Sequence, residues 1–228
     1  MIVCNVKVNA APPVYEQVRK VLYELKSTTY THDIFIDERK GIYNLDCSGF
    51  ADHILKSAHE KAADELESLS YPKRPLAKNF VEFFSQLQDG DGSHWQKIRY
   101  LRHLKLGDIV AWLIPPGSSS KDTGHVMIVT GAFRINPLNK NEYFVPVTDS
   151  ASSGHGKQDP RRRKGPNGVG SGVIGLIADN YDRPIAFRWS GQESQQLKYT
   201  TIRMARTFDG QPQTHSKINF LAGEGNFQ

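Results

Sequence analysis

The chain is poor in cysteine, with only Cys4 and Cys47 among its 228 residues. Two cysteines exclude a framework of several disulfides, and they exclude a zinc site built from clustered thiolates. A single Cys4–Cys47 bridge is compatible with the count, but it would consume the cysteine whose surroundings are typical of a reactive thiol. We therefore expect Cys47 to be free, and we expect neither a metal ion nor another cofactor.

Long apolar runs are also missing. No stretch approaches the roughly 18 residues that a membrane-spanning helix needs, so no transmembrane segment is predicted. The first residues are apolar and Val8-Asn9-Ala10 faintly resembles a cleavage site, but Lys7 interrupts the run and no basic segment precedes it. The sequence therefore shows no clear signal peptide.

The chain lacks a large excess of either charge, with 29 basic and 24 acidic residues and a net charge of +5. Such a balance fits an ordinary surface, and it also fits anionic partners such as acidic cell-wall polymers, membranes or nucleic acids. The basic residues are scattered except at residues 161–164 (Arg-Arg-Arg-Lys), which Pro160 and Gly165 flank as in an exposed loop. No RNA-binding or helix-turn-helix pattern accompanies this run, so specific nucleic-acid binding is not expected.

The order of the predicted elements indicates an α+β fold. Apolar residues recur at helical spacing in the first half of the chain and at β-like spacing from about residue 109 onward. Helices followed by strands are typical of this class. Residues 27–46 are polar and irregular, and residues 150–172 are expected to form a long surface loop. The predicted helices cover residues 13–26, a segment from near 47, 60–70 and 79–88, and the predicted strands cover 109–114, 125–133, 142–148, 173–179, 184–189 and 198–204.

Cys47 lies where one of these helices is predicted to begin. Asp46 occupies the N-cap position, and Phe50 and Ile54 belong to the apolar stripe of the helix. A helix N-terminus favours the thiolate form of a cysteine, and its free N–H groups can hold an oxyanion. A buried cysteine that acts only as a small apolar residue is the alternative. We interpret Cys47 as a nucleophile, because it lies among small polar residues rather than within the apolar stripe.

The base that such a nucleophile needs is predicted to be His125. His53 lies on the same helix as Cys47, but six positions turn its side chain through about 240° and away from the thiol, and His59 is out of reach. His125 opens an apolar strand, and a strand start at the rim of a sheet can present its side chain to a helix N-terminus. A strand-end histidine without a partner is the alternative. The other histidines are interpreted as surface residues: His32, His94, His103, His155 and His215.

A third polar group usually fixes the tautomer of such a histidine. Asp149 follows the apolar stretch at residues 143–147. If the strands at 125–130 and 143–148 are adjacent and antiparallel, Asp149 lies near His125. An Asx turn that closes the strand is the other interpretation of Asp149, and His155 is a second candidate for the orienting role.

Three segments resemble, in the same order, the motifs of NlpC/P60 peptidases, a papain-like family of cysteine hydrolases. Residues 45–50 (LDCSGF) resemble the nucleophile motif, residues 106–110 (LGDIV) a strand that follows it, and residues 124–129 (GHVMIV) the histidine strand. Tyr30 is similar to the tyrosine that lines the site in this family. Asp149 falls where the third residue is expected, which is more often a histidine.

The resemblance implies a single catalytic domain over residues 1–228 with a papain-like fold, in which the cysteine helix packs against an antiparallel sheet. The core would cover residues 14–152. The spacing of 78 residues between nucleophile and base (125 − 47) requires a helical insertion, which we place at residues 60–104. Residues 153–228 have no counterpart in the family and would form a C-terminal β extension. Residues 31–33 (Thr-His-Asp) replace the usual Trp-Gly-Gly.

The resemblance also implies an activity, which is the hydrolysis of amide bonds in the stem peptides of bacterial peptidoglycan, in the periplasm or outside the cell. Cys47 would attack the amide and form a thioester, His125 would act as the base, and Asp149 would orient His125. A basic protein suits this acidic polymer. The residues expected on the substrate and oxyanion side are Tyr30, Asp46 and Ser48.

Three other functions stay open. The chain could be an acyltransferase or an amidase on another acyl substrate, with residues 150–228 forming a second wall of the pocket. It could be a catalytically silent module that binds cell walls. The third alternative is nucleic-acid binding through residues 161–164, which would show a steep dependence on salt.

Overall fold

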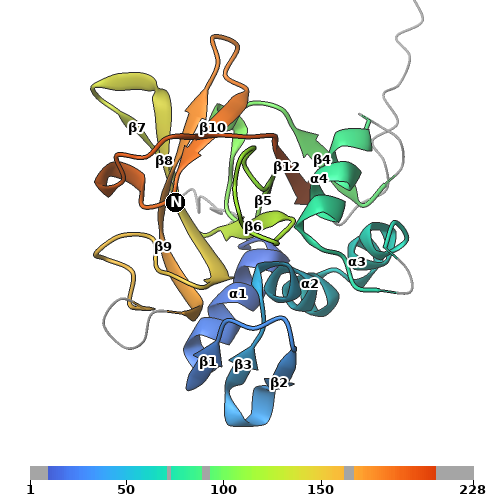
Figure 1. Ribbon diagram of the computed structural model, residues 1–228. Helices are drawn as coiled ribbons and strands as arrows, with labels where there is room; N and C mark the ends of the chain where they lie inside the picture. The colour runs from blue at the N-terminus through green and yellow to red at the C-terminus, as the bar shows by residue number, and fades with distance from the viewer. Residues whose placement is uncertain (1–9, 71–72, 89–92, 162–166, 209–228) are drawn as a thin grey trace, which may run out of the picture.

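The computed structural model describes residues 10–70, 73–88, 93–161 and 167–208. Helices dominate the first half of this part of the chain and strands the second half, which confirms the predicted α+β class (Figure 1). A large antiparallel sheet forms the body of the molecule, the helices pack on one of its faces, and a small sheet lies beside them.

The described residues form four α-helices, whose positions agree with the predicted ones to within a few residues. Pro13 opens the first helix, where its missing N–H costs nothing. The second helix begins at Cys47, and the buried side chains of Phe50 and Ile54 face the core. No helix among the described residues is long and apolar enough to cross a membrane. The helices are α1 (Pro13–Glu24), α2 (Cys47–Ala58), α3 (Glu60–Glu67) and α4 (Ala77–Gln86).

Residues 27–46 are not irregular, as the sequence suggested, but form a three-stranded sheet with the order β1-β3-β2. Each strand has three residues, which is too short to show an alternating pattern. Thr28 ties this sheet to the large one, because its hydroxyl donates to the Tyr43 carbonyl at 2.6 Å and accepts the Val169 N–H at 2.8 Å. The elements are β1 (Ser27–Thr29), β2 (Phe35–Asp37), the 3-10 helix η1 (Glu38–Lys40) and β3 (Ile42–Asn44).

The large sheet has nine strands, and eight of them follow the order β11-β10-β9-β8-β6-β5-β12-β4, with β7 paired to β8. The strands β6 and β8 are antiparallel neighbours, which confirms the pairing that the prediction for Asp149 requires. The predicted strand at 198–204 is two strands, β11 and β12. The elements are β4 (Trp95–Ile98), η2 (Leu101–His103), β5 (Ile109–Leu113), β6 (Gly124–Val129), β7 (Arg134–Asn136), β8 (Asn139–Ala151), β9 (Gly168–Ala178), β10 (Pro184–Arg188), η3 (Gly191–Glu193), β11 (Lys198–Tyr199) and β12 (Ile202–Thr207).

The prediction of a long surface loop at residues 150–172 is wrong at both ends. The strand β8 continues to Ala151, and β9 starts at Gly168 and pairs with it. The expectation that residues 161–164 are exposed is wrong for Arg161, which is only 4% exposed to solvent. Residues 162–164 lie outside the described part of the chain. Glycine and serine read as loop residues in the sequence, but here the glycines belong to a strand.

The sheet curls on itself, so the molecule has two apolar cores. One core lies between the helices and the outer face of the sheet, and the other lies inside the curl. Phe187 of β10 stacks on Trp112 of β5 with ring centroids 4.1 Å apart, although three strands separate β10 from β5 in the sheet order. Successive residues of the central strands β5 and β6 therefore face different cores.

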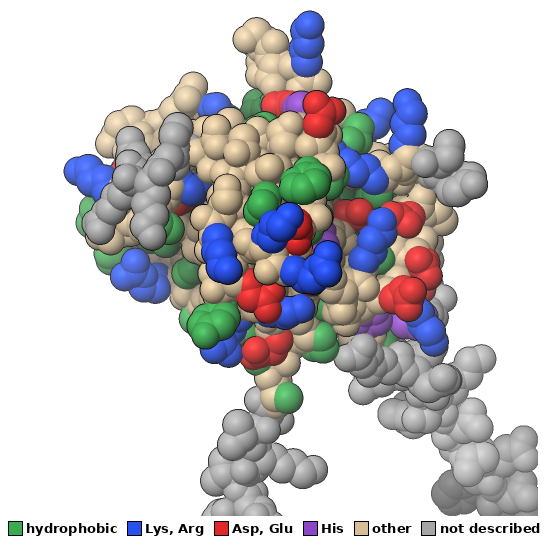
Figure 2. Space-filling view, turned by 90° about the horizontal axis from the view of Figure 1, so that it is seen from below, with side chains coloured by type: hydrophobic (Ala, Val, Ile, Leu, Met, Phe, Trp, Pro, Cys, Tyr) green, Lys and Arg blue, Asp and Glu red, His purple; other side chains and the backbone are tan. Residues whose placement is uncertain are grey.

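Figure 2 shows the molecule from below the view of Figure 1. On this face the Lys and Arg side chains are interspersed with Asp and Glu side chains. This mixture fits the modest net charge of +5 and is typical of an ordinary protein surface.

The contact of Thr28 with two backbones generates a prediction about stability. Thr28→Val keeps the shape of the side chain but leaves the Val169 N–H and the Tyr43 carbonyl without this partner. We expect a loss of about 1–2 kcal/mol in the free energy of unfolding, measured by urea denaturation. Thr29→Val is the matched control, since Thr29 is exposed on the same strand, and an equal loss in both variants would contradict the role of Thr28.

Candidate active site

The nucleophile predicted from the sequence lies at the very start of α2. Cys47 is a free thiol that is 4% exposed, and Cys4 lies outside the described residues. Asp46 caps the helix, because its Oδ1 accepts the Gly49 N–H at 2.8 Å. The N–H groups of a first helical turn have no carbonyl partner within the helix. The thiol is therefore accompanied by backbone donors that can hold an oxyanion.

The side chains of Asp46 and Ser48 fix this helix end and do not line the cavity described below. Arg74 donates to Asp46 Oδ2 at 2.5 Å and to Ser48 Oγ at 2.8 Å, and His32 Nδ1 lies 2.9 Å from Asp46 Oδ2. Burial raises the pKa of Asp46, but the Gly49 N–H, His32 and Arg74 outweigh it and lower the pKa. We therefore correct the expected substrate-side role of both side chains to a positioning role. No pattern in the sequence indicated Arg74, since it lies 28 positions from Asp46.

His125 stands at the start of β6, at the rim of the sheet. Gly124 precedes it with φ +149°, and a Cβ there would come within 1.8 Å of the Trp112 carbonyl oxygen. Only glycine therefore allows β6 to pair this closely with β5. Trp112 is directly opposite His125 in the register, and their ring centroids are 5.5 Å apart.

The structure brings Cys47, His125 and Asp149 together. The Nε2 atom of His125 lies 2.5 Å from Asp149 Oδ2, and the imidazole is close enough to the Cys47 thiol for the two groups to interact electrostatically. Since the Nε2 atom of His125 is bonded to Asp149, the Nδ1 atom of the same ring is the nitrogen that can interact with the Cys47 thiol. A nucleophile, a base and an orienting carboxylate in contact are the arrangement that nucleophilic catalysis requires.

The electrostatics of this site favour a charged imidazole. Burial lowers the pKa of His125, but the Cys47 thiol and the Asp149 carboxylate outweigh it and raise the pKa to about 10. Burial likewise raises the pKa of Asp149, but His155, Arg161 and His125 together hold it well below its usual value. A permanent carboxylate therefore stabilises an imidazolium beside the thiol.

His155 stands behind Asp149, and it is not the surface residue that the sequence suggested, being 2% exposed. Its Nε2 lies 2.8 Å from Asp149 Oδ2, and its Nδ1 lies 2.9 Å from the Trp189 carbonyl oxygen. A carboxylate and a carbonyl oxygen both accept hydrogen bonds. Both ring nitrogens of His155 therefore lie next to hydrogen-bond acceptors. Asp149 orients His125 directly, and His155 supports Asp149.

Arg161 completes the buried network. Its Nη1 donates to Asp149 Oδ1 at 2.9 Å, and its Nη2 donates to Asp159 Oδ2 at 2.6 Å. Two glycines of β9 make room for the network. A Cβ on Gly170 would come within 2.6 Å of the Arg161 side chain, and a Cβ on Gly172 would come within 2.7 Å of the Cβ of His155. The glycine-rich segment that read as a loop therefore leaves the space that this cluster of charges needs.

The alternative interpretation of this cluster of His125, Asp149 and His155 is a metal-binding site. His125, Asp149 and His155 offer ligand atoms that lie within 4.8 Å of one another. However, Asp149 Oδ2 already binds both imidazoles, and the Arg161 guanidinium contacts the other carboxylate oxygen. A metal would have to displace both hydrogen bonds and sit close to a buried cation. The donor set thus fits a hydrogen-bonded triad better than a metal centre.

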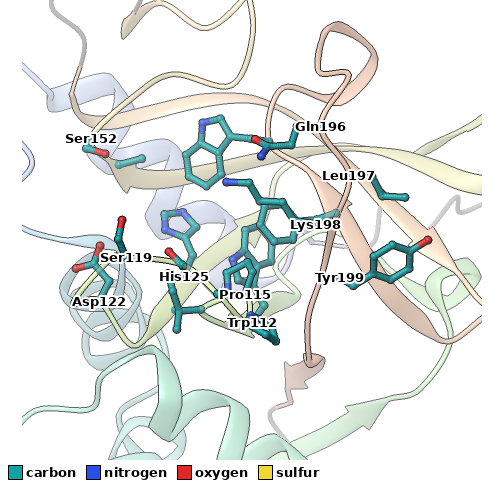
Figure 3. Close-up of a pocket in the computed structure, with 18 of the residues that line it drawn as sticks. Trp112, Pro115, Ser119, Asp122, His125, Ser152, Gln196, Leu197, Lys198 and Tyr199 are labelled. Atoms are coloured by element: carbon teal, nitrogen blue, oxygen red, sulfur yellow. The ribbon is translucent and has the colours of Figure 1, made fainter.

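A cavity of about 710 Å³ opens beside His125 (Figure 3), within the size range of small-molecule sites. Tyr30 lines it as the sequence predicted. Burial, followed by the charges of Cys47 and Asp122, raises the pKa of Tyr30, so its hydroxyl keeps its proton and can donate to an oxyanion. Residues from the C-terminal part also line the cavity, as the acyltransferase alternative expected of residues 150–228. Among them are Ser152, Phe187, Trp189, Gln196, Leu197, Lys198 and Tyr199.

The remaining histidines lie away from the thiol. The His53 ring lies 5.8 Å from the Tyr43 ring and turns away from Cys47, as expected. His59 Nε2 lies 3.0 Å from the Phe208 carbonyl oxygen, His94 Nδ1 lies 2.6 Å from Glu65, and His103 lies against Tyr100. His215 lies outside the described residues.

Comparison with known proteins yields a distant relative. An uncharacterized protein of Acanthamoeba polyphaga mimivirus is 28% identical over 159 residues, which cover 64% of this chain and 68% of that protein. No family model matches the chain. No solved structure is similar to it.

The pKa of His125 generates a prediction about pH. The imidazolium attracts iodoacetate to Cys47, and we expect the rate ratio of iodoacetate to iodoacetamide to fall as the pH rises through about 10. Asp149→Asn removes two of the causes that raise this pKa, so the midpoint should move to lower pH. Alkylation of Cys47 followed by mass spectrometry gives the rates. Asp64→Asn, at an exposed position of α3, should leave the midpoint unchanged, and an unchanged midpoint in Asp149→Asn would refute the coupling.

The choice of a triad over a metal centre can be tested by metal removal. Dialysis against EDTA should leave the rate of Cys47 alkylation and the thermal unfolding temperature unchanged, because hydrogen bonds alone hold His125, Asp149 and His155. A drop in either quantity that zinc restores would show a metal centre instead.

Proposed function

We propose that the protein is a cysteine hydrolase that cleaves amide bonds through a Cys47 thioester. The observation that carries this proposal is the position of His125, whose imidazole interacts electrostatically with the Cys47 thiol and lies 2.5 Å from a fully buried carboxylate. A histidine held in this way can take the proton of a nucleophile and return it to a leaving group.

The proposed mechanism has two halves. The Cys47 thiolate attacks the carbonyl carbon, and the oxyanion accepts hydrogen bonds from the N–H groups at the start of α2 and from the Tyr30 hydroxyl. The C–N bond breaks as the His125 imidazolium gives its proton to the leaving amine, which leaves a thioester. Neutral His125 then takes a proton from water, and the resulting hydroxide cleaves the thioester and releases the acid.

The proposed fold is papain-like, with the nucleophile at a helix N-terminus and the base at the start of a strand in an antiparallel sheet. The motifs at residues 45–50, 106–110 and 124–129 support it, and they also support peptidoglycan stem peptides as the substrate. A periplasmic or secreted location follows from this choice of substrate. The geometry supports the thiol chemistry, whereas the sequence motifs alone support the cell-wall peptide.

Acyl transfer is the second candidate, and one observation favours it. The C-terminal half forms a full wall of the cavity beside His125, so an acceptor amine could bind there and intercept the thioester before water does. Addition of hydroxylamine or glycine amide would separate the two reactions, since a transferase yields the acylated amine. The nucleic-acid alternative is weakened, because Arg161 is buried in an ion pair with Asp149 and Asp159.

The proposed function predicts that Cys47→Ala abolishes turnover without unfolding the protein. Purified peptidoglycan is digested by the wild type and the variant, and soluble fragments are read by mass spectrometry. We expect fragments cut within the stem peptide from the wild type and a loss of at least about a thousandfold in the variant. Cys47→Ser is the conservative control for shape, and thermal unfolding checks that both variants fold.

Two results would contradict the proposal in different ways. Full activity in Cys47→Ala would remove the cysteine from the mechanism. No fragments from the wild type, while Cys47 is still rapidly alkylated, would keep the reactive thiol but exclude peptidoglycan as its substrate.

A further inference from the structure

The cavity beside His125 contains a lysine that none of the catalytic steps uses. Lys198 lies on β11, directly opposite Phe187 of β10 in the register. Side chains of directly opposed residues share one face of a sheet. Phe187 lines the cavity and stacks on Trp112, so Lys198 also faces the cavity. Figure 3 shows its side chain directed from β11 toward the side where His125 lies.

This lysine carries a charge that the cavity does not balance nearby. Lys198 is half-buried, and no carboxylate of the described residues forms an ion pair with it. Besides Lys198, two charged side chains line the cavity among the described residues, His125 and Asp122. Asp122 pairs with His32 at 3.4 Å. In Figure 3, Asp122 lies on one side of His125 and Lys198 on the other. An anion in this cavity is therefore attracted to the His125 imidazolium and to Lys198 and repelled from Asp122, and Lys198 is the attracting group that lies away from the proposed reacting atoms.

An aromatic wall lies between the lysine and the catalytic histidine. Trp112 and Phe187 stack at 4.1 Å, and the Trp189 ring lies 4.9 Å from the His125 ring. Aromatic faces bind apolar groups and leave polar groups to the rim. A ligand that spans this distance needs an apolar portion next to the reacting carbonyl and an anionic group beyond it.

We propose that Lys198 is a specificity residue that binds the carboxylate of an acyl substrate whose apolar side chain lies on the Trp112–Phe187–Trp189 wall. This inference rests on the proposed function for the position of the scissile carbonyl at Cys47. A single lysine matches the single charge of a carboxylate, whereas a phosphate dianion calls for more donors than this wall supplies. The anion subsite also sets the direction of the substrate, because its carboxylate end points to β11 and away from Asp122.

The subsite can be tested without turnover, in the Cys47→Ala protein. Three probes share one phenylalkyl group and differ in the terminal group: 3-phenylpropionate, 3-phenylpropionamide and phenethyl phosphate. Binding is titrated at pH 7 through tryptophan fluorescence, since Trp112 and Trp189 line the cavity. We expect the carboxylate to bind about tenfold more tightly than the amide, as a charge-assisted hydrogen bond would give.

The lysine is then removed in the same background. Lys198→Gln should bring the carboxylate and the amide to within about twofold of each other. Lys61→Gln, at an exposed position of α3, is the control for a change in net charge and should keep the tenfold preference. Equal binding of carboxylate and amide before the change, or a preference that survives Lys198→Gln, would overturn the subsite.

Two further comparisons distinguish a carboxylate ligand from a phosphate ligand, and the proposed subsite from the proposed hydrolase activity. Tighter binding of the phosphate than of the carboxylate would overturn the carboxylate assignment. A preference that Lys198→Gln abolishes supports the subsite even where the peptidoglycan digestion fails, because binding is measured without the thiol. Digestion by the wild type together with no carboxylate preference would support the hydrolase and refute the subsite.

Discussion

A buried carboxylate costs several kcal/mol of desolvation unless neighbouring donors offset it, and Asp149 is completely buried. Its two oxygens contact His125, His155 and Arg161, and these contacts keep it ionised. The charge then serves the site, because it raises the pKa of His125 beside the thiol. The price of burying Asp149 explains why a second histidine and an arginine are buried behind a catalytic centre that needs only three groups for its chemistry.

The three groups of the proposed triad come from two parts of the fold, and a different set of contacts positions each part. On the helix side, Arg74 and Asp46 fix the first turn of α2 and hence the thiol. On the sheet side, the pairing of β6 with β8 sets His125 against Asp149. The cavity beside His125 is lined by residues of the sheet and by Tyr30, and it is the proposed place where substrate approaches. Tyr30 lines this cavity together with His125, so one proposed oxyanion donor and the proposed base border the same space.

The curl of the sheet decides which residues line this cavity, and with them the kind of substrate that we propose for it. It carries β10 and β11 round to β5, and so places an aromatic wall and Lys198 in the cavity that His125 lines, although 73 positions (198 − 125) separate Lys198 from His125 in the sequence. In the proposed mechanism, α2, β6 and β8 supply the reacting groups, and the C-terminal strands supply the contacts for selection. Different substrates could therefore be selected by changes in the C-terminal strands alone, with the thiol and its base unchanged.

The sequence by itself determined the features that depend on neighbours along the chain. An N-cap before an apolar helical stripe marked the start of α2 and with it Cys47, and the apolar stretch after Gly124 marked the strand of His125. Only the tertiary structure decided what lies behind and opposite these residues. His155 and Arg161 read as surface residues, because glycines that make room for buried charge look the same in a sequence as glycines of a loop. Lys198 showed no signal at all, since its role arises from strand pairing and sheet curl, and these join residues that share no local pattern.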